Sequence, residues 1–191
     1  MNVRIMTIGK ASIILILFFI TSQEVWAQND EDDCSLSFTI PEIALLDIEP
    51  SGLSNISLTL TADSESGLPI SASGAINDDL WINYTSCLAT GSNSRSVSVH
   101  IASGSIPNGV SLILSPSAYS GSGQGTFGSP SRNIILSNTP QTLISGIGRC
   151  YTGDGQNNGH KLSYSLNISD YNSLNYNNST TIQIAFTLTD N

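Results

Sequence analysis

Residues 161–168 read KLSYSLNI, and in this stretch the apolar side chains of Leu162, Tyr164, Leu166 and Ile168 occupy every second position. Successive side chains of a β-strand point to opposite faces, so the pattern predicts a strand with one buried face. The same period of two recurs at residues 36–40, 56–60, 80–84, 97–101 and 182–188. Shorter apolar runs at residues 111–115, 133–137 and 142–147 are interpreted as further strands, which makes about nine.

The segments between these strands favour turns over helices, because they are rich in Gly, Pro, Asn, Asp and Ser. The segment Pro41–Glu49 comes closest to a helical pattern, but Pro41 and Pro50 bound it and allow at most one helical turn. Residues 117–133 are rich in Gly and Ser and are expected to form a long mobile hairpin or surface loop. The sequence therefore predicts an all-β chain, a single antiparallel β-sandwich with Greek-key-like crossovers, and a β-barrel is the alternative.

The N-terminus has the pattern of a secretory signal peptide. Arg4 and Lys10 precede the apolar residues 11–20, and Val25 and Ala27 provide small side chains before a cleavage site. The apolar run is too short to span a bilayer core of about 30 Å. We expect a signal peptide at residues 1–27, an acidic disordered segment at 28–35 and the sandwich at 36–191. The expected location is secreted or on the cell surface, with passage through a periplasm where one exists.

The charge of the mature chain excludes two classes of partner. Cleavage after Ala27 removes Arg4, Lys10 and Glu24 and leaves four basic and 14 acidic residues, a net charge of −10. Four basic side chains are too few to neutralise the phosphate groups of a nucleic acid or an anionic membrane. Neither is therefore an expected partner.

Three cysteines follow the signal peptide, an odd number for an oxidising compartment. Cys87 and Cys150 each close an apolar segment, and we predict a disulfide between them, worth about 4 kcal/mol in the chain-entropy model. Cys34 is then left over: it stays free, joins two chains, or replaces one member of the predicted pair.

Motifs for catalysis are weak, and we expect no enzyme and no cofactor. No serine lies in a G-x-S-x-G elbow, and His100 fits the polar face of a strand. Gly123, Gly125 and Gly128 match G-x-G-x-x-G, but Pro130 follows in place of the helix that a dinucleotide site needs.

The stretch RCYTGDGQNNGHK, Arg149–Lys161, is predicted to be a hairpin end held by the disulfide, because its glycines and asparagines allow positive φ. Asp154 and Asn157 form a minority hypothesis for a calcium site within it. No zinc site is expected, since no further Cys or His has suitable spacing.

Three aromatic residues are candidates for ligand binding, because aromatic rings stack on sugars: Trp81, Tyr119 and Phe127. Trp81 is predicted on the strand face opposite Leu80 and Ile82, where it faces solvent or a partner unless the strand is buried on both sides.

The C-terminal segment STTIQIAFTLTDN, residues 179–191, resembles the last strand of bacterial surface and fimbrial β-sandwich domains, including spore-coat-U-like and WxL-type exported domains. The resemblance implies a structural or adhesive role at the cell surface. The defining tryptophan of WxL domains is absent, so binding to the cell wall is not carried over.

These observations predict a secreted or surface-bound, non-catalytic structural or adhesive component, fimbria-like, with a carbohydrate-binding module as the alternative. Expected partners are other copies of the chain, other surface proteins or glycans. Residues 34–40, CSLSFTI, carry alternating apolar side chains and serve either as the first strand of the domain or as a strand added to a neighbouring subunit.

Overall fold

A computed structural model describes residues 32–52, 55–176 and 179–191 of the chain. Of these, the residues from Ile40 to Asn191 belong to one compact unit. The predicted signal peptide lies outside the described residues, and within them no helix is long and apolar enough to cross a membrane. The described residues contain one short 3₁₀-helix, η1 (Tyr171–Ser173), and nine strands: β1 (Ile43–Glu49), β2 (Ile76–Cys87), β3 (Arg95–Ser103), β4 (Val110–Pro116), β5 (Gln124–Pro130), β6 (Ile134–Ile135), β7 (Gln141–Tyr151), β8 (His160–Ile168) and β9 (Gln183–Asp190).

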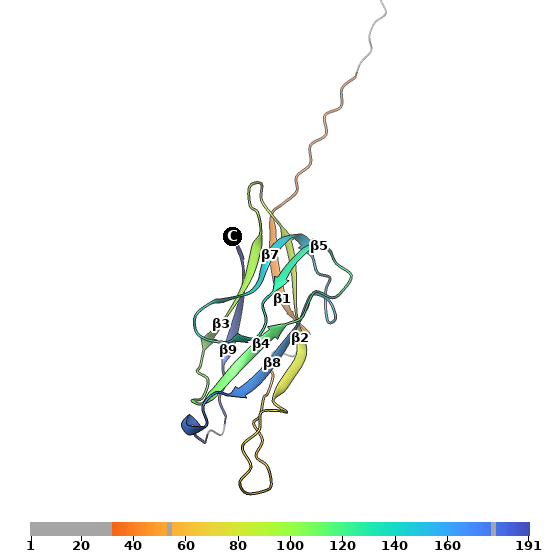
Figure 1. The fold of residues 1–191 in the computed structure, drawn as a ribbon. Helices are drawn as coiled ribbons and strands as arrows, with labels where there is room; N and C mark the ends of the chain where they lie inside the picture. Colours follow the sequence, from red (N-terminus) through yellow and green to blue (C-terminus); the bar gives the residue numbers. More distant parts are fainter. Residues whose placement is uncertain (1–31, 53–54, 177–178) are drawn as a thin grey trace, which may run out of the picture. The chain divides into compact units, whose positions relative to one another are not determined.

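The strands form one antiparallel hydrogen-bonded network with the order β6-β4-β8-β2-β7-β3-β9, while β1 pairs with β2 and β5 pairs with β7. Figure 1 shows β4 beside β8 and β3 beside β9. The long strand β2 joins the β6-β4-β8 strands to the β7-β3-β9 strands, since its residues Ile76–Ile82 pair with β8 and its residues Thr85–Ser86 pair with β7. Most neighbours in the order are not consecutive in sequence, so the connections cross over. The predicted all-β, sandwich-like fold is confirmed.

The core is built from the alternating apolar positions of the central strands. In β2 the buried apolar residues are Leu80, Ile82 and Tyr84, and in β3 they are Val97, Val99 and Ile101. Strands β4, β7 and β8 contribute a further set of buried side chains: Leu112, Leu114, Leu143, Ile144, Ile147, Leu162 and Tyr164. In β2, β3, β4 and β8 these positions match the period of two in the sequence, because burial of one face selects an apolar residue at every second position.

Two predicted strands are wrong. Residues 36–40 form no strand or helix. Residues 55–60 lie outside the network as well, although Ile56 and Leu58 pack against the core. In residues 55–60 the apolar alternation reflects burial of side chains without backbone pairing. The pattern alone therefore does not distinguish a strand from an extended segment.

Two observed strands were not predicted. Strand β1 replaces the expected helical turn, and it lacks a clean alternation because it pairs with β2 alone and leaves Leu45 64% exposed. Strand β5 lies inside the segment expected to be a long hairpin or surface loop, and it pairs with β7. Two glycines allow close contact with β7: a Cβ on Gly123, just before β5, would overlap the carbonyl oxygen of Tyr151, and a Cβ on Gly125 in β5 would overlap that of Arg149. The G-x-G-x-x-G pattern thus serves close strand packing here.

A buried arginine ties three strands together at one end of the sandwich. Arg95 at the start of β3 is 2% exposed, and its guanidinium bonds the carboxylates of Glu42 at 2.5 Å and Asp190 at 2.7 Å. It also donates to the carbonyl oxygens of Ile43 and Cys87 and, at 3.3 Å, to the hydroxyl of Ser86. Arg95 therefore joins the start of β1, the end of β2 and the end of β9.

Candidate functional site

Two of the three predicted ligand-binding aromatics lie together in the structure. The rings of Tyr119 and Phe127 stack with centroids 3.5 Å apart and planes 10° apart. The Tyr119 ring also meets His160 edge-on, at 6.1 Å between centroids. Trp81 is separate from this cluster: it lies on β2 between Glu49 of β1 and Lys161 of β8, and it is partly buried. The three candidates do not form one flat row.

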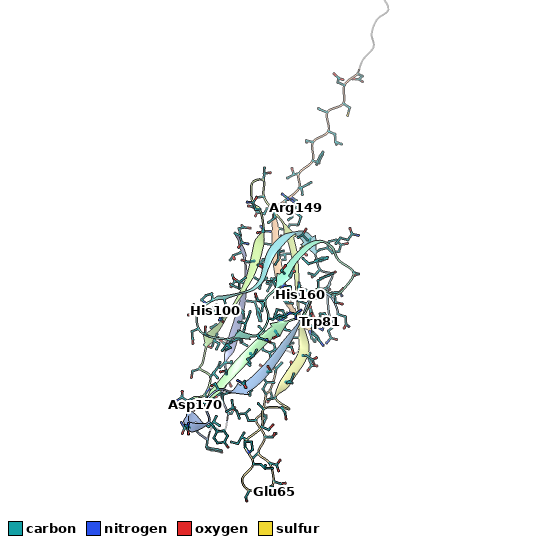
Figure 2. All side chains as sticks on the ribbon, in the orientation of Figure 1. Glu65, Trp81, His100, Arg149, His160 and Asp170 are labelled. Carbon is teal, nitrogen blue, oxygen red and sulfur yellow. The ribbon has the colours of Figure 1, made fainter. Side chains whose placement is uncertain are left out.

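His160, which was not predicted as a site residue, lies at the base of this aromatic cluster. It is 0% exposed and is joined to two other elements by hydrogen bonds. Its Nδ1 lies 2.8 Å from the carbonyl oxygen of Ser117, and its Nε2 lies 2.8 Å from the hydroxyl of Tyr84. That hydroxyl in turn contacts the carbonyl oxygen of Phe127. Figure 2 labels His160 within the body of the strands.

The three hydrogen bonds that link Ser117, His160, Tyr84 and Phe127 depend on the protonation state of His160. Both ends are carbonyl oxygens, which accept only, so the three hydrogen bonds need three protons. A neutral imidazole and the hydroxyl of Tyr84 carry two. The chain is therefore complete only when the imidazole is protonated, whereas burial favours the neutral form.

Stability is expected to fall on mild acidification because of His160. Burial lowers the pKa of His160, and the carbonyl groups of Ser117 and Phe127 offset this only in part. The unfolded chain then binds the proton first, so the free energy of unfolding is constant above about pH 6.5 and falls below it, by up to about 1.4 kcal/mol per pH unit, until the pH reaches the lowered pKa. Urea titrations from pH 7.5 to about 5 measure this slope.

The variant His160→Gln is expected to remove that slope, and His100→Gln on β3 is expected to leave it in place. Equal slopes in the parent protein and in His160→Gln would contradict the assignment to His160.

The predicted Cys87–Cys150 disulfide is absent, since Cys34, Cys87 and Cys150 are all free thiols in the structure. The strand register gives the reason. Cys150 of β7 lies opposite Ser86 of β2, so Cys87, one residue further, points to the other face of the strand. Burial raises the pKa of Cys150 to about 11, which keeps its thiol protonated at neutral pH.

The predicted hairpin at Arg149–Lys161 is also corrected. Strands β7 and β8 do not pair with each other, because both pair with β2 and are separated along it. The connecting loop, residues 152–159, runs along the edge of β2: the amide of Thr152 donates to the carbonyl of Tyr84, and the amide of Tyr84 donates to the hydroxyl of Thr152.

Only one of the two predicted calcium ligands lines a hollow in the structure. Asp154 lines a hollow of about 480 Å³ between β1, β2 and this loop, whereas Asn157 is not among its lining residues and has a positive φ of 66°. Asp47 of β1 and Asn83 of β2 line the same hollow. Sequence reasoning missed both residues, because Asp47 belongs to the strand that was not predicted and Asn83 alternates with core residues as an ordinary polar position.

Comparisons give no family for this chain: no protein-family model, no curated protein and no solved structure matches it. Within the described residues, no group of three or more His, Cys, Asp or Glu side chains is placed to hold a metal ion.

Proposed function

We propose that the chain is an exported, non-catalytic structural subunit that joins other copies of itself by strand addition at the cell surface. The observation that carries the proposal is the exposure of the segment Cys34–Ile40, in which Leu36 is 87%, Phe38 83% and Ile40 74% exposed. Burying an aliphatic or aromatic side chain of this size contributes roughly 1.5–3 kcal/mol. Three such side chains at strand spacing favour a partner that covers them.

The sandwich offers edges to which such a strand fits. Strand β9 ends the pairing order, and among the described strands it pairs only with β3. Its sequence QIAFTLTD contains no Lys or Pro, the residues that usually protect an edge strand from a further strand. Ile184, Phe186 and Leu188 on β9 are only partly buried and alternate with the period of two that an added strand needs. These features support β9 as the acceptor.

Strand β1 adds to the same argument. It approaches β9 without being paired with it, and Arg95 holds the ends of the two strands together through Glu42 and Asp190. Leu46 and Ile48 of β1 are likewise only partly buried against the core. An added strand along β9 would cover these partly buried side chains further.

Self-association of the mature chain is expected to depend on Phe38. Placing a carboxylate at this position removes the largest apolar side chain of the segment and adds a charge that resists burial. Light scattering across a wide concentration range is expected to give multimers for the parent protein and monomers for Phe38→Asp. The matched control is Ser37→Asp, which adds the same charge to the polar side of the same segment and is expected to keep the multimers.

A monomeric parent protein at every concentration would contradict the proposal. A monomer whose midpoint of thermal unfolding falls in Phe38→Asp and not in Ser37→Asp would also contradict it, because it would identify the segment as a strand of its own domain.

The carbohydrate-binding alternative has less support. Stacking on a sugar needs an open aromatic face, and Tyr119 and Phe127 cover each other. Trp81 is partly buried and lies apart from both.

A further inference from the structure

The hollow between β1, β2 and the 152–159 loop, here called the β1–β2 hollow, has the features of a small polar site. Its lining includes Asp47, Asn83, Tyr151, Gly153 and Asp154. Asp47 lies directly opposite Asn83 in the antiparallel pairing of β1 and β2, so both side chains are on the same face of the strands. Asp154 approaches this face from the loop.

The amide orientation of Asn83 is fixed by its neighbours. Its Nδ2 donates to the carbonyl oxygens of Gly153 at 2.9 Å and Gly155 at 3.1 Å. The reversed orientation would place the amide oxygen against two carbonyl oxygens, which only accept. Because the oxygen and nitrogen of an amide point in different directions, Oδ1 is turned away from the carbonyl oxygens of Gly153 and Gly155, in a residue that lines the hollow.

The Oδ1 of Asn83 is a buried acceptor without a donor. The residue is 5% exposed, and Oδ1 has no hydrogen-bond partner in the structure. Leaving a buried polar atom unsatisfied costs stability, so this oxygen favours a bound cation or a hydrogen-bond donor as its partner. One oxygen of the neighbouring Asp47 carboxylate already accepts from the Ile48 amide at 2.8 Å, and its second oxygen is left for a ligand.

The donor atoms gathered here select one class of ligand. Two carboxylates and an amide carbonyl are hard oxygen donors, and the lining contains no cysteine sulfur and no imidazole. The negative charges of Asp47 and Asp154 favour a cation over an anion or a neutral ligand. A site open on one side, with donors from two strands and a loop, suits the irregular coordination of Ca²⁺ better than the rigid octahedron of Mg²⁺.

We propose that the β1–β2 hollow binds Ca²⁺ through the carboxylates of Asp47 and Asp154 and the Oδ1 of Asn83, with water completing the coordination. With only two charged ligands, both exposed, the expected affinity is that of extracellular modules, with Kd of about 10⁻⁴–10⁻³ M. The ion would fix the 152–159 loop against β1 and β2. The site is independent of strand addition, since none of its residues belongs to Cys34–Ile40 or to β9.

Calorimetric titration of the mature protein with CaCl₂ tests the proposal. Saturable binding of one ion in the stated range is expected, with MgCl₂ binding more weakly. Asp154→Asn and Asp47→Asn are each expected to weaken binding by roughly tenfold or more, because each removes one of two charges. NMR shifts on adding Ca²⁺ are expected to concentrate at Asn83, Gly153 and their neighbours.

The matched control is Asp63→Asn, which makes the same change in net charge in the loop that carries Glu65. Figure 2 places Glu65 at the opposite end of the sandwich from Arg149, which is two residues before Tyr151 of the hollow. Asp63→Asn is expected to bind like the parent protein. The proposal is overturned if no saturable binding occurs at millimolar Ca²⁺. It is also overturned if Asp47→Asn and Asp154→Asn, which both change exposed residues, bind Ca²⁺ as tightly as Asp63→Asn does.

Discussion

Replacing Arg95 with methionine is expected to lower the free energy of unfolding by about 3 kcal/mol, measured by urea denaturation at neutral pH. Methionine has a similar length and keeps most of the apolar packing of the arginine stem. The loss therefore comes from the guanidinium group, which has no replacement in the variant.

The size of this effect follows from what Arg95 contacts. The ion pairs contribute little on their own, because the Glu42 and Asp190 side chains are 47% and 53% exposed and remain hydrated in the variant. Most of the lost stability comes from the carbonyl oxygens of Ile43 and Cys87 and from the hydroxyl of Ser86, a residue that is 3% exposed. Each of these acceptors loses a charged donor in a place that water reaches poorly.

The control for this prediction is Arg132→Met, which removes the same charge from an exposed position and is expected to change stability by less than about 0.5 kcal/mol. If the two variants were equally stable, Arg95 would not hold β1 and β9 together. A loss in Arg95→Met accompanied by faster hydrogen exchange in β1 would identify the strand that is released.

The central strands could be predicted from the sequence because burial on one face imposes a period of two. In β8, Leu162 and Tyr164 are 0% and 2% exposed, and they are two of the alternating positions that predict the strand. In β3, Val97, Val99 and Ile101 are buried in the same way. Strand pairing and order, by contrast, depend on contacts between distant segments that this pattern does not encode.

The peripheral strands were missed for opposite physical reasons. Strand β1 has apolar residues on both faces, because Leu46 and Ile48 pack on the core while Leu45 stays exposed beside the hollow. Its pattern therefore lacks a clean period. Strand β5 has almost no apolar residues, and its close approach to β7 leaves room only for glycine at two positions, Gly125 and Gly128.

The candidate sites could be predicted only where one residue type is informative by itself. The loop sequence indicates Asp154 as a possible calcium ligand, and Asp154 lines the hollow. Its neighbours Asp47 and Asn83 come from β1 and β2, and only the register of those strands brings them near. The sequence pattern places His160 at the end of a turn. Its buried contact with Tyr84 arises because the 152–159 loop runs along β2 and β8 then pairs with that strand.

Replacing Gly125 with alanine is expected to lower the free energy of unfolding by about 4 kcal/mol. Two effects add together. Gly125 has a φ of 109°, which side chains rarely adopt, and a Cβ there would overlap the carbonyl oxygen of Arg149 and crowd the backbone of Cys150. Because these atoms belong to the backbone of β7, no side-chain rotation relieves the overlap, and β5 must move away from β7.

Gly91→Ala separates the two effects. Gly91 has a φ of 97°, close to that of Gly125, yet a Cβ at this position meets no atom within 4 Å. It is therefore expected to lose only the cost of the unfavourable φ, about 1 kcal/mol. The difference between the two variants measures the cost of forcing β5 from β7, and hydrogen exchange in Gly125→Ala is expected to rise in both strands. Equal losses in the two variants would mean that positive φ alone explains the glycine, and that close packing of β5 on β7 does not account for the G-x-G-x-x-G pattern.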